Sequence, residues 1–325
     1  MNARRPVFES LESRQLFAAD ITATLTNGSL YINEVASTQN GFDQAIQLSS
    51  LSNGKVRVAG ITSQNPADTR SSRVNGAAFA DYTVTGAIYV NFKDGGDVVK
   101  LQNLNTNDIQ IATGGVTWQW PDSDLVEVRG GNIRTLVINT GIGNDTVKIQ
   151  DTMIGIGLSG PSYLIVNTGD GTDSIDVNNL RSMSTVAISA GNDADWLQMV
   201  NSTIHNGLKI DLGSGNDQFK IQNTAPRYLE VKAGLGNDIG AIDGVYATYQ
   251  FDLDMGEGDD TLAARNFDGA SGVLDGGLGN DTLHLNSSTT KLQRRNWERF
   301  GDPLSAAIDA IAGAITLRKG SGVSN

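Results

Sequence analysis

Seven aspartates recur along the chain at a nearly constant spacing, and their carboxylates are candidates for binding a hard cation. The intervals are 28, 22, 22, 21, 22 and 21 residues, and the positions are Asp145, Asp173, Asp195, Asp217, Asp238, Asp260 and Asp281. Each ends a turn of the form Gly-x-Gly-Asn-Asp, with small substitutions in some copies. Carboxylate and carbonyl oxygens suit Ca²⁺ rather than zinc. The candidate ligands therefore also include glycine carbonyls of the last four full turns, from Gly213, Gly215, Gly234, Gly236, Gly256, Gly258, Gly277 and Gly279.

The spacing of these carboxylates decides whether they need a counter-charge. If successive turns stack at the distance between neighbouring strands, the carboxylates lie about 5 Å apart. At an effective dielectric near 20, each neighbouring pair then repels by roughly 3 kcal/mol before screening. Calcium ions between the turns would offset this repulsion. Alternatively, each aspartate accepts its own backbone N–H groups in an Asx turn. The sequence leaves both arrangements open.

Apolar residues flank each turn with the alternation of β-strands. They stand two and four positions after the aspartate, as in Val147 and Ile149, and seven and nine positions before it, with Gly240 and Gly272 as exceptions. A period of two places these residues on one buried face, and stacking of repeats joins them into one core. We therefore expect an all-β fold: a single-stranded right-handed parallel β-helix, or solenoid, of about ten rungs of 21–22 residues. At ~4.8 Å per rung, it would be roughly 45–50 Å long.

Weaker copies extend the repeat toward the N-terminus. Asp97 and Asp124 are each followed by the same apolar alternation, and the successive intervals from Asp97 through Asp124 to Asp145 are 27 and 21 residues. The segment around Phe42-Asp43 is an earlier candidate turn, and residues 60–84 read as a polar insertion.

A second column lies six residues after the aspartates. It holds Asn103, Asp151, Asn179, Asn201, Asn223 and Asn266. The column resembles the asparagine ladder of parallel β-helices, in which each Asn occupies a left-handed turn and its amide hydrogen-bonds along the stack. We interpret it as structural.

The two ends of the repeat array differ in pattern from its middle. We predict an N-terminal segment over 1–20, the repeat domain over 21–290 and a C-terminal cap over 291–325. Asp302-Pro303 predicts a helix start, apolar residues follow at helical spacing, and Arg318-Lys319-Gly320 predicts its stop. This short helix would cover exposed strand edges.

The N-terminal segment carries a motif. Phe8-Glu-Ser-Leu-Glu-Ser-Arg-Gln-Leu-Phe17 resembles the FE-x-LE-x-R-x-LL motif of many bacterial surface and secreted proteins with repetitive β domains. The resemblance implies a role in sorting. The alternative is a short amphipathic helix that covers the open end of the repeat, because no apolar stretch of a standard signal peptide follows Arg4 and Arg5.

The Gly-Asn-Asp turn resembles the Gly-Gly-x-Gly-x-Asp nonapeptide of RTX, or haemolysin-type, calcium-binding proteins. The nearest copies are Gly276-Gly-Leu-Gly-Asn-Asp281 and Ala233-Gly-Leu-Gly-Asn-Asp238. The resemblance implies that glycine carbonyls and aspartates of successive turns hold Ca²⁺. One departure matters: RTX repeats run every nine residues and supply both sides of each coil, whereas this turn occurs once per 21–22 residues. An RTX-like site would here be half supplied.

Composition excludes several function classes. The chain of 325 residues has a formal net charge of −12, which argues against a nucleic-acid partner. It has no cysteine, so disulfides, thiolate nucleophiles and Cys-based zinc sites are excluded. It has no run of 18 apolar residues, so we expect no membrane-spanning helix.

Candidates for catalysis or sugar binding are few. Tyr228 and Tyr249 share one position in adjacent repeats and would form a small sugar-stacking surface or pack on the rod as loop aromatics. A polysaccharide lyase or hydrolase would need charged residues grouped on one outward face. Four arginines fall 5, 8, 10 and 5 residues after their aspartates and do not make a clear column: Arg129, Arg181, Arg227 and Arg265. His205 and His284 lack ligand partners at a useful spacing and read as surface residues.

The sequence as a whole indicates a secreted or cell-surface repeat protein with a structural or adhesive role, calcium as a structural ion and polysaccharide or other matrix components as partners. A carbohydrate-active β-helix enzyme or sugar-binding module is the alternative. We assign no catalytic residues, and the non-enzymatic interpretation is favoured.

Overall fold

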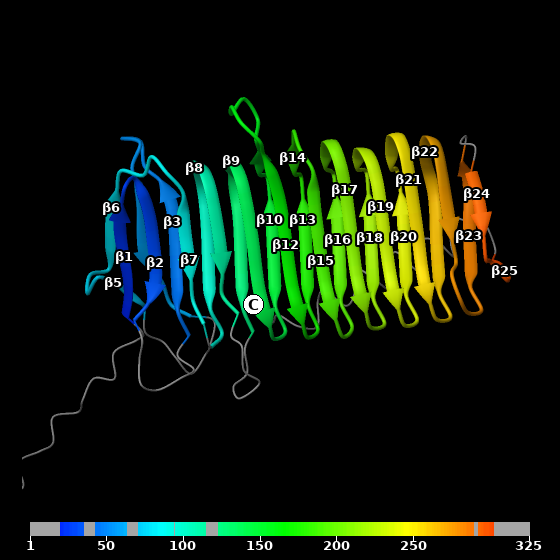
Figure 1. Cartoon of the computed structure of the whole chain (residues 1–325), viewed down its shortest axis with the longest axis horizontal. Helices are drawn as coiled ribbons and strands as arrows, with labels where there is room; N and C mark the ends of the chain where they lie inside the picture. Colours follow the sequence, from blue (N-terminus) through cyan, green and yellow to red (C-terminus); the bar gives the residue numbers. More distant parts are fainter. Residues whose placement is uncertain are drawn as a thin grey trace, which may run out of the picture.

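The structure is a computed structural model that describes residues 20–35, 43–63, 71–93, 95–114, 123–288 and 292–301. The described residues form an all-β fold without helices, in which strands run across a long axis and, from β7 onward, follow one another along it in chain order (Figure 1). Parallel pairing dominates. This confirms the all-β, parallel-strand fold class that the repeat predicts. None of the described residues forms a helix able to span a bilayer.

Strands from β8 onward form the regular part of the fold. They are β8 (Val98–Ala112), β9 (Leu125–Ile142), β10 (Thr146–Gln150), β11 (Met153–Ile154), β12 (Tyr163–Asp170), β13 (Ser174–Asn178), β14 (Arg181–Ser182), β15 (Val186–Asn192), β16 (Trp196–Val200), β17 (Thr203–Ser214), β18 (Gln218–Gln222), β19 (Ala225–Leu235), β20 (Ile239–Asp243), β21 (Tyr246–Glu257), β22 (Thr261–Asp275), β23 (Thr282–Ser288), β24 (Leu292–Arg295) and β25 (Arg299–Phe300).

Two long parallel ladders connect these strands, and their register is the one that aligning the aspartates gives. After the aspartate, Val147 pairs with Ile175 and Ile175 with Leu197. Before it, β12, β15, β17, β19 and β21 pair in sequence. A third, short ladder, which the sequence analysis did not anticipate, links β11, β14 and the start of β17. Each repeat thus contributes three strand segments, each paired with its equivalent in the next repeat.

The inward positions of the ladders form one continuous core. Val147, Ile149, Ile175 and Val177 are all buried, as the alternation predicts. The two exceptions in the pattern are explained by their neighbours. A Cβ at Gly240 would lie 2.3 Å from Cζ of Phe219, and a Cβ at Gly272 would lie 2.3 Å from Cζ of Phe251. A large ring in one repeat therefore occupies the space that a glycine leaves in the next.

The N-terminal region departs from the parallel pattern. Its strands are β1 (Asp20–Thr26), β2 (Ser29–Glu34), β3 (Ala45–Ser50), β4 (Val56–Gly60), β5 (Arg73–Val74), β6 (Phe79–Tyr82) and β7 (Ile88–Asn91). β1 and β2 form an antiparallel hairpin, and β4 pairs antiparallel with both β3 and β6. The region 60–84 that read as a polar insertion thus contributes strands to the sheet. β2 and β3 join the regular ladders through parallel pairs with β7 and β8.

The described strands continue past the predicted boundary at residue 290. β24 pairs in parallel with β22, and β25 with β23, so residues 292–300 extend the repeat. The helix predicted after Asp302 and the motif between Phe8 and Phe17 lie outside the described residues.

Candidate functional site: a buried aspartate column

The seven repeated aspartates form one buried column. Each Oδ1 accepts a hydrogen bond from the backbone N–H of the aspartate one repeat earlier. The distance is 2.8 Å from Asp173 N to Asp195 Oδ1, 2.7 Å from Asp195 N to Asp217 Oδ1 and 2.8 Å from Asp217 N to Asp238 Oδ1. These side chains are at most 3% exposed. The column is thus held together by bonds between repeats, and not by Asx turns within one.

The weaker upstream copies belong to the same column. Asp97 N donates to Asp124 Oδ1 at 2.8 Å, and Asp124 N donates to Asp145 Oδ1 at 2.8 Å. The column begins at Gln44, whose N–H donates to Asp97 Oδ1 at 2.6 Å. It ends where Asp281 N donates to Glu298 Oε2 at 2.9 Å.

The second carboxylate oxygen has no hydrogen-bond partner in each of the seven predicted positions. These atoms are Oδ2 of Asp145, Asp173, Asp195, Asp217, Asp238, Asp260 and Asp281. A buried polar atom without a partner costs about 1–3 kcal/mol, and more when it is charged. A proton or a cation on each carboxylate would relieve this cost.

Burial raises the pKa of these carboxyl groups well above its ordinary value. Desolvation is the largest cause, and the backbone N–H donated by the preceding aspartate opposes it. The pKa rises to about 6 for Asp217, about 7 for Asp173, Asp238 and Asp260, and about 8 for Asp195. Neighbouring carboxylates of the column add to the increase for Asp195. Desolvation also raises the pKa of Asp145 and Asp281.

Residues five positions before each aspartate line the inner side of the column. A Cβ at Gly276 would lie 2.8 Å from Asp281 Oδ2. The hydroxyl group of Thr140 donates to the carbonyl oxygen of Thr168 at 3.2 Å, and that of Thr168 donates to the carbonyl oxygen of Ala190 at 3.0 Å. Both hydroxyl groups also oppose the rise in pKa of the nearby carboxyl groups of Asp145 and Asp173. The equivalent residues in the next four repeats are buried and apolar: Ala190, Leu212, Ala233 and Met255. In those repeats this position therefore supplies no side-chain oxygen to an ion.

The glycines of the turn are required by the stacking. Gly213 has φ +99°, and a Cβ there would lie 1.9 Å from the carbonyl oxygen of Gly191. Gly236 has φ +126°, and a Cβ there would lie 1.6 Å from the carbonyl oxygen of Gly215. The same approach recurs for the other predicted ligand glycines, Gly215, Gly234, Gly256, Gly258, Gly277 and Gly279. The turns form a cradle of bare backbone along the whole column.

A second, exposed column of side chains runs beside the aspartates, at the position just before each of them. Here the bonds run the opposite way. Asn216 Oδ1 accepts the N–H of Asn237 at 2.7 Å, and Asn237 Oδ1 accepts the N–H of Asp259 at 2.8 Å. Both columns satisfy backbone N–H groups of the turn.

The asparagine column six residues after the aspartates is structural, as predicted. Asn103, Asp151, Asn179, Asn201, Asn223 and Asn266 all have φ between 48° and 54°. Asn179 Nδ2 donates to Asp151 Oδ1 at 2.7 Å. In the repeat of Asp238, where the position six residues after the aspartate is a glycine, Gly244 takes the same left-handed turn with φ +65°.

Of the other predicted candidates, Arg227, Tyr228 and Tyr249 lie together on the surface, whereas the remaining ones do not gather into one site. Arg129 donates to Gln150 at 2.7 Å, and Arg265 pairs with Asp243 at 2.8 Å, so both hold neighbouring repeats together. His205 Nδ1 lies 3.2 Å from the carbonyl oxygen of Ser182. Within the described ranges, three or more His, Asp or Glu side chains nowhere cluster around one point suited to a metal ion. The aspartates form a single file, so an ion between them needs backbone carbonyl ligands as well.

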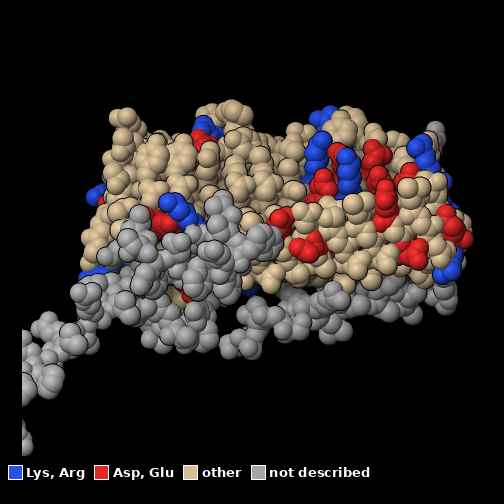
Figure 2. All heavy atoms as spheres, turned by 60° about the horizontal axis from the view of Figure 1, so that its bottom comes forward, with Lys and Arg blue, Asp and Glu red and all other residues tan. Residues whose placement is uncertain are grey.

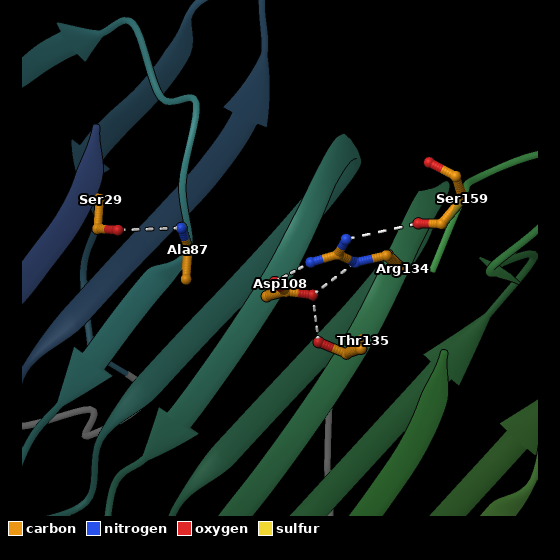
Figure 3. A network of polar contacts seen from close by, with 6 residues as sticks. All are labelled: Ser29, Ala87, Asp108, Arg134, Thr135 and Ser159. Carbon is orange, nitrogen blue, oxygen red and sulfur yellow. Dashed lines mark hydrogen bonds and ion pairs between the residues drawn. The ribbon is translucent and has the colours of Figure 1, made fainter. Parts of the chain in front are cut away.

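A polar network that the sequence did not reveal links β8, β9 and the loop after β11 (Figure 3). Arg134 and the Thr135 hydroxyl both donate to the Asp108 carboxylate, Arg134 Nε at 3.0 Å and Thr135 Oγ1 at 2.6 Å. Arg134 also reaches the carbonyl oxygen of Ser159 at 3.5 Å. The hydrogen bond from Arg134 is the largest cause that lowers the pKa of Asp108. The network fastens the longest of the regular repeats to its neighbour.

Comparison with known proteins gives no relative: no family model, no curated protein and no solved structure matches this chain.

Proposed function

We propose that this chain is a structural and adhesive repeat protein of the cell exterior, built as a single-stranded right-handed parallel β-helix and stabilised by calcium along the aspartate column. Right-handed connection of parallel strands is the general rule for such folds. The observation that carries the calcium proposal is the unpartnered Oδ2 atom in each of seven stacked, buried aspartates.

A comparison of the two side-chain columns in the turn supports a charged role for the inner one. Both columns accept a backbone N–H through Oδ1. The outer column does so mostly with neutral amides, those of Asn144, Asn216 and Asn237, and once with a carboxylate, that of Asp259. The inner column uses aspartate from Asp97 to Asp281, although an asparagine would accept the same bond without the cost of desolvating a charge. Repeated use of a carboxylate at this cost favours a cation as its partner.

The residues around the column fit calcium. Carboxylate oxygens without partners and the backbone carbonyls of the glycine turns are hard oxygen donors, which Ca²⁺ binds in flexible geometry. The carbonyl oxygen of Gly256 also accepts the N–H of Leu278 at 2.7 Å. Asp217, Asp238 and Asp260 would hold the ion with carbonyl groups of the turns at Gly213, Gly215, Gly234, Gly236, Gly256 and Gly258. The ion would supply the positive charge that the column lacks.

Three features support a place outside the cell and an adhesive role. The segment from Phe8 to Phe17 resembles a motif of bacterial surface and secreted proteins. The chain has no cysteine and carries a net charge of −12. The described residues form an elongated stack that presents long outward faces (Figure 1). The enzyme alternative is weaker, because Arg129 and Arg265 are each paired with a side chain of a neighbouring repeat, Gln150 and Asp243 respectively, and do not belong to the tyrosine cluster.

The calcium proposal is tested by thermal unfolding in EGTA, in millimolar Ca²⁺ and in millimolar Mg²⁺. We expect a higher midpoint in Ca²⁺ than in EGTA or Mg²⁺, because a single site saturated at 100 times its Kd adds about 2.7 kcal/mol. The triple variant Asp217→Asn, Asp238→Asn, Asp260→Asn should lose this increase. The matched control replaces three outward carboxylates of neighbouring strands, Asp211, Asp252 and Asp254, and should keep it.

An unchanged midpoint in Ca²⁺ would remove calcium from the proposal while leaving the fold intact. The location is tested separately, by binding of an antibody against the folded protein to intact cells. Antibody binding only after cell lysis would refute a surface location.

A further inference from the structure

A compact group of exposed aromatic and charged side chains lies on β17, β19 and β21, away from the aspartate column. We call it the tyrosine face, and it consists of Arg227, Tyr228, Tyr249 and the outward residues of these three strands. The rings of Tyr228 and Tyr249 stack at 5.3 Å between centroids with an interplanar angle of 28°. Arg227 Cζ lies 4.4 Å from the Tyr249 centroid and 5.5 Å from that of Tyr228. Neighbouring repeats thus fix two aromatic rings in place while 40% and 49% of these residues stay exposed.

The neighbour of Tyr228 on the other side is a glycine. In the register of β17 and β19, Gly207 pairs with Tyr228. The position paired with Tyr228 in the preceding repeat therefore carries no side chain. A Cβ at Gly207 would meet nothing closer than the side chain of Thr185 at 3.9 Å, so the fold has room for a larger residue there. The sequence therefore leaves one flank of the aromatic pair open, although space for a side chain exists.

A shallow depression of about 230 Å³ lies further along the same strands, over β12, β15, β17 and β19. Its floor includes the small side chains of Ala187 and Ser189, and its rim includes Lys209 and Glu230. Glu230 lies 3.2 Å from Lys209 and 3.6 Å from Lys232. Figure 2 shows the charged side chains gathered over this half of the molecule, with cationic and anionic columns side by side.

The charges of the tyrosine face nearly cancel. Its cationic residues are Arg227, Lys209 and Lys232, and its anionic residues are Asp211, Glu230, Asp252 and Asp254. Such a surface offers hydrogen-bond donors and acceptors with little net field, which suits an uncharged polar ligand. Rings that are fixed before binding lower the entropic cost of binding. Tyrosine adds an apolar face and a hydroxyl group.

We propose that the tyrosine face binds a neutral polysaccharide. The apolar faces of its sugar rings lie against Tyr228 and Tyr249, and its hydroxyl groups take hydrogen bonds from the charged side chains along the depression. Arg227 orients the aromatic pair. The proposal goes beyond the calcium column, which is buried on another part of each repeat, and gives the adhesive role a ligand class.

The test is electrophoresis of the full chain in native gels that contain hydroxyethylcellulose, galactomannan or polygalacturonate, with millimolar Ca²⁺ throughout. We expect at least one neutral polymer to retard the protein several-fold, with the retardation unchanged by 0.5 M NaCl (roughly a 4 Å screening length). Tyr228→Ala with Tyr249→Ala should abolish the retardation.

Gly207→Val should abolish it as well, because the new side chain stands beside Tyr228, while the thermal midpoint stays that of the parent chain. The matched control is Tyr89→Ala, which breaks the other stacked pair, Tyr31 and Tyr89, at 5.0 Å between centroids. This variant should be retarded like the parent chain. If polygalacturonate alone retarded the protein, or if 0.5 M NaCl abolished the retardation, the proposal of a neutral ligand would be wrong. Absence of retardation in every gel, or full retardation of both tyrosine-face variants, would overturn the site.

Discussion

Replacing one aspartate of the column by asparagine should stabilise the protein at high pH in chelator and destabilise it, relative to the parent chain, in Ca²⁺. Asp238 is fully buried, its Oδ1 accepts the N–H of Asp217 at 2.8 Å, and its Oδ2 has no partner. Asp238→Asn keeps the Oδ1 acceptor and removes the charge. The variant therefore isolates the cost of ionisation from the hydrogen bond that joins the repeats.

The magnitude follows from the raised pKa. Desolvation moves the pKa of Asp238 from 3.8 to about 7, which corresponds to about 4 kcal/mol. Because the folded pKa lies above the unfolded one, the contribution of this carboxyl group is fully present below about pH 4 and is lost as pH rises through about 7. Asparagine has no such loss. In chelator, the variant should equal the parent chain near pH 4 and exceed its free energy of unfolding by about 4 kcal/mol above pH 7.

The assay is urea unfolding followed by circular dichroism from pH 4 to pH 8, with and without Ca²⁺. In Ca²⁺ at pH 8 the order should invert, because the parent chain gains a bound ion that the variant cannot hold. Asp254→Asn, at an exposed position of β21, should change the midpoint little at any pH. A variant that is less stable than the parent chain at pH 8 in chelator would refute the argument that ionisation of the buried column is costly.

Three further predictions concern the fold. Gly213→Ala should destabilise strongly or prevent folding, because its Cβ would lie 1.9 Å from a carbonyl oxygen of the preceding repeat; Gly54→Ala, with φ +77° and open space, should cost only about 1 kcal/mol in thermal melts. Phe219→Ala should cost about 3–5 kcal/mol of stability, and adding Gly240→Val should recover part of this loss, whereas Gly240→Val alone should clash with the Phe219 ring. A double-mutant cycle measures the coupling between the two positions, and additive effects would contradict this packing. Asn179→Ala should cost roughly 1–2 kcal/mol and Asn179→Gly less, because the residue has φ +54°; equal losses in urea midpoints would show that the left-handed turn is unimportant.

The repeat made the fold and the order of the column predictable. Aligning the aspartates places Val147 against Ile175 and Gly141 against Gly169, and the ladders have these pairs. A period of two identifies which residues point inward, so the core follows as well. The dipeptide Asn27-Gly28 is a sequence signal for the first hairpin that the repeat pattern does not include. Both residues have positive φ, as a two-residue hairpin turn requires.

Other features depend on contacts between repeats that one repeat does not encode. The sequence suggests that each aspartate either accepts its own backbone N–H groups in an Asx turn or binds a cation. In the structure, each Oδ1 instead accepts an N–H from the neighbouring repeat. The pattern identifies Gly240 and Gly272 as breaks, but only the stacked rings of Phe219 and Phe251 explain them. The antiparallel pairing of β4 with β3 and β6 has no repeat to reveal it.

The direction of the hydrogen bonds in the column explains why its two ends differ. Each Oδ1 accepts an N–H from the preceding repeat, so the first member needs only to donate, and its side chain is not required as an acceptor. Gln44 therefore suffices at the start, where its N–H donates to Asp97. At the other end, the N–H of Asp281 needs an acceptor from a repeat that has no aspartate turn. Glu298, seventeen residues onward, supplies that acceptor through its longer side chain. Substitution of Glu298 should therefore expose the last N–H of the column, whereas substitution of Gln44 by another residue of similar size should leave every N–H of the column paired.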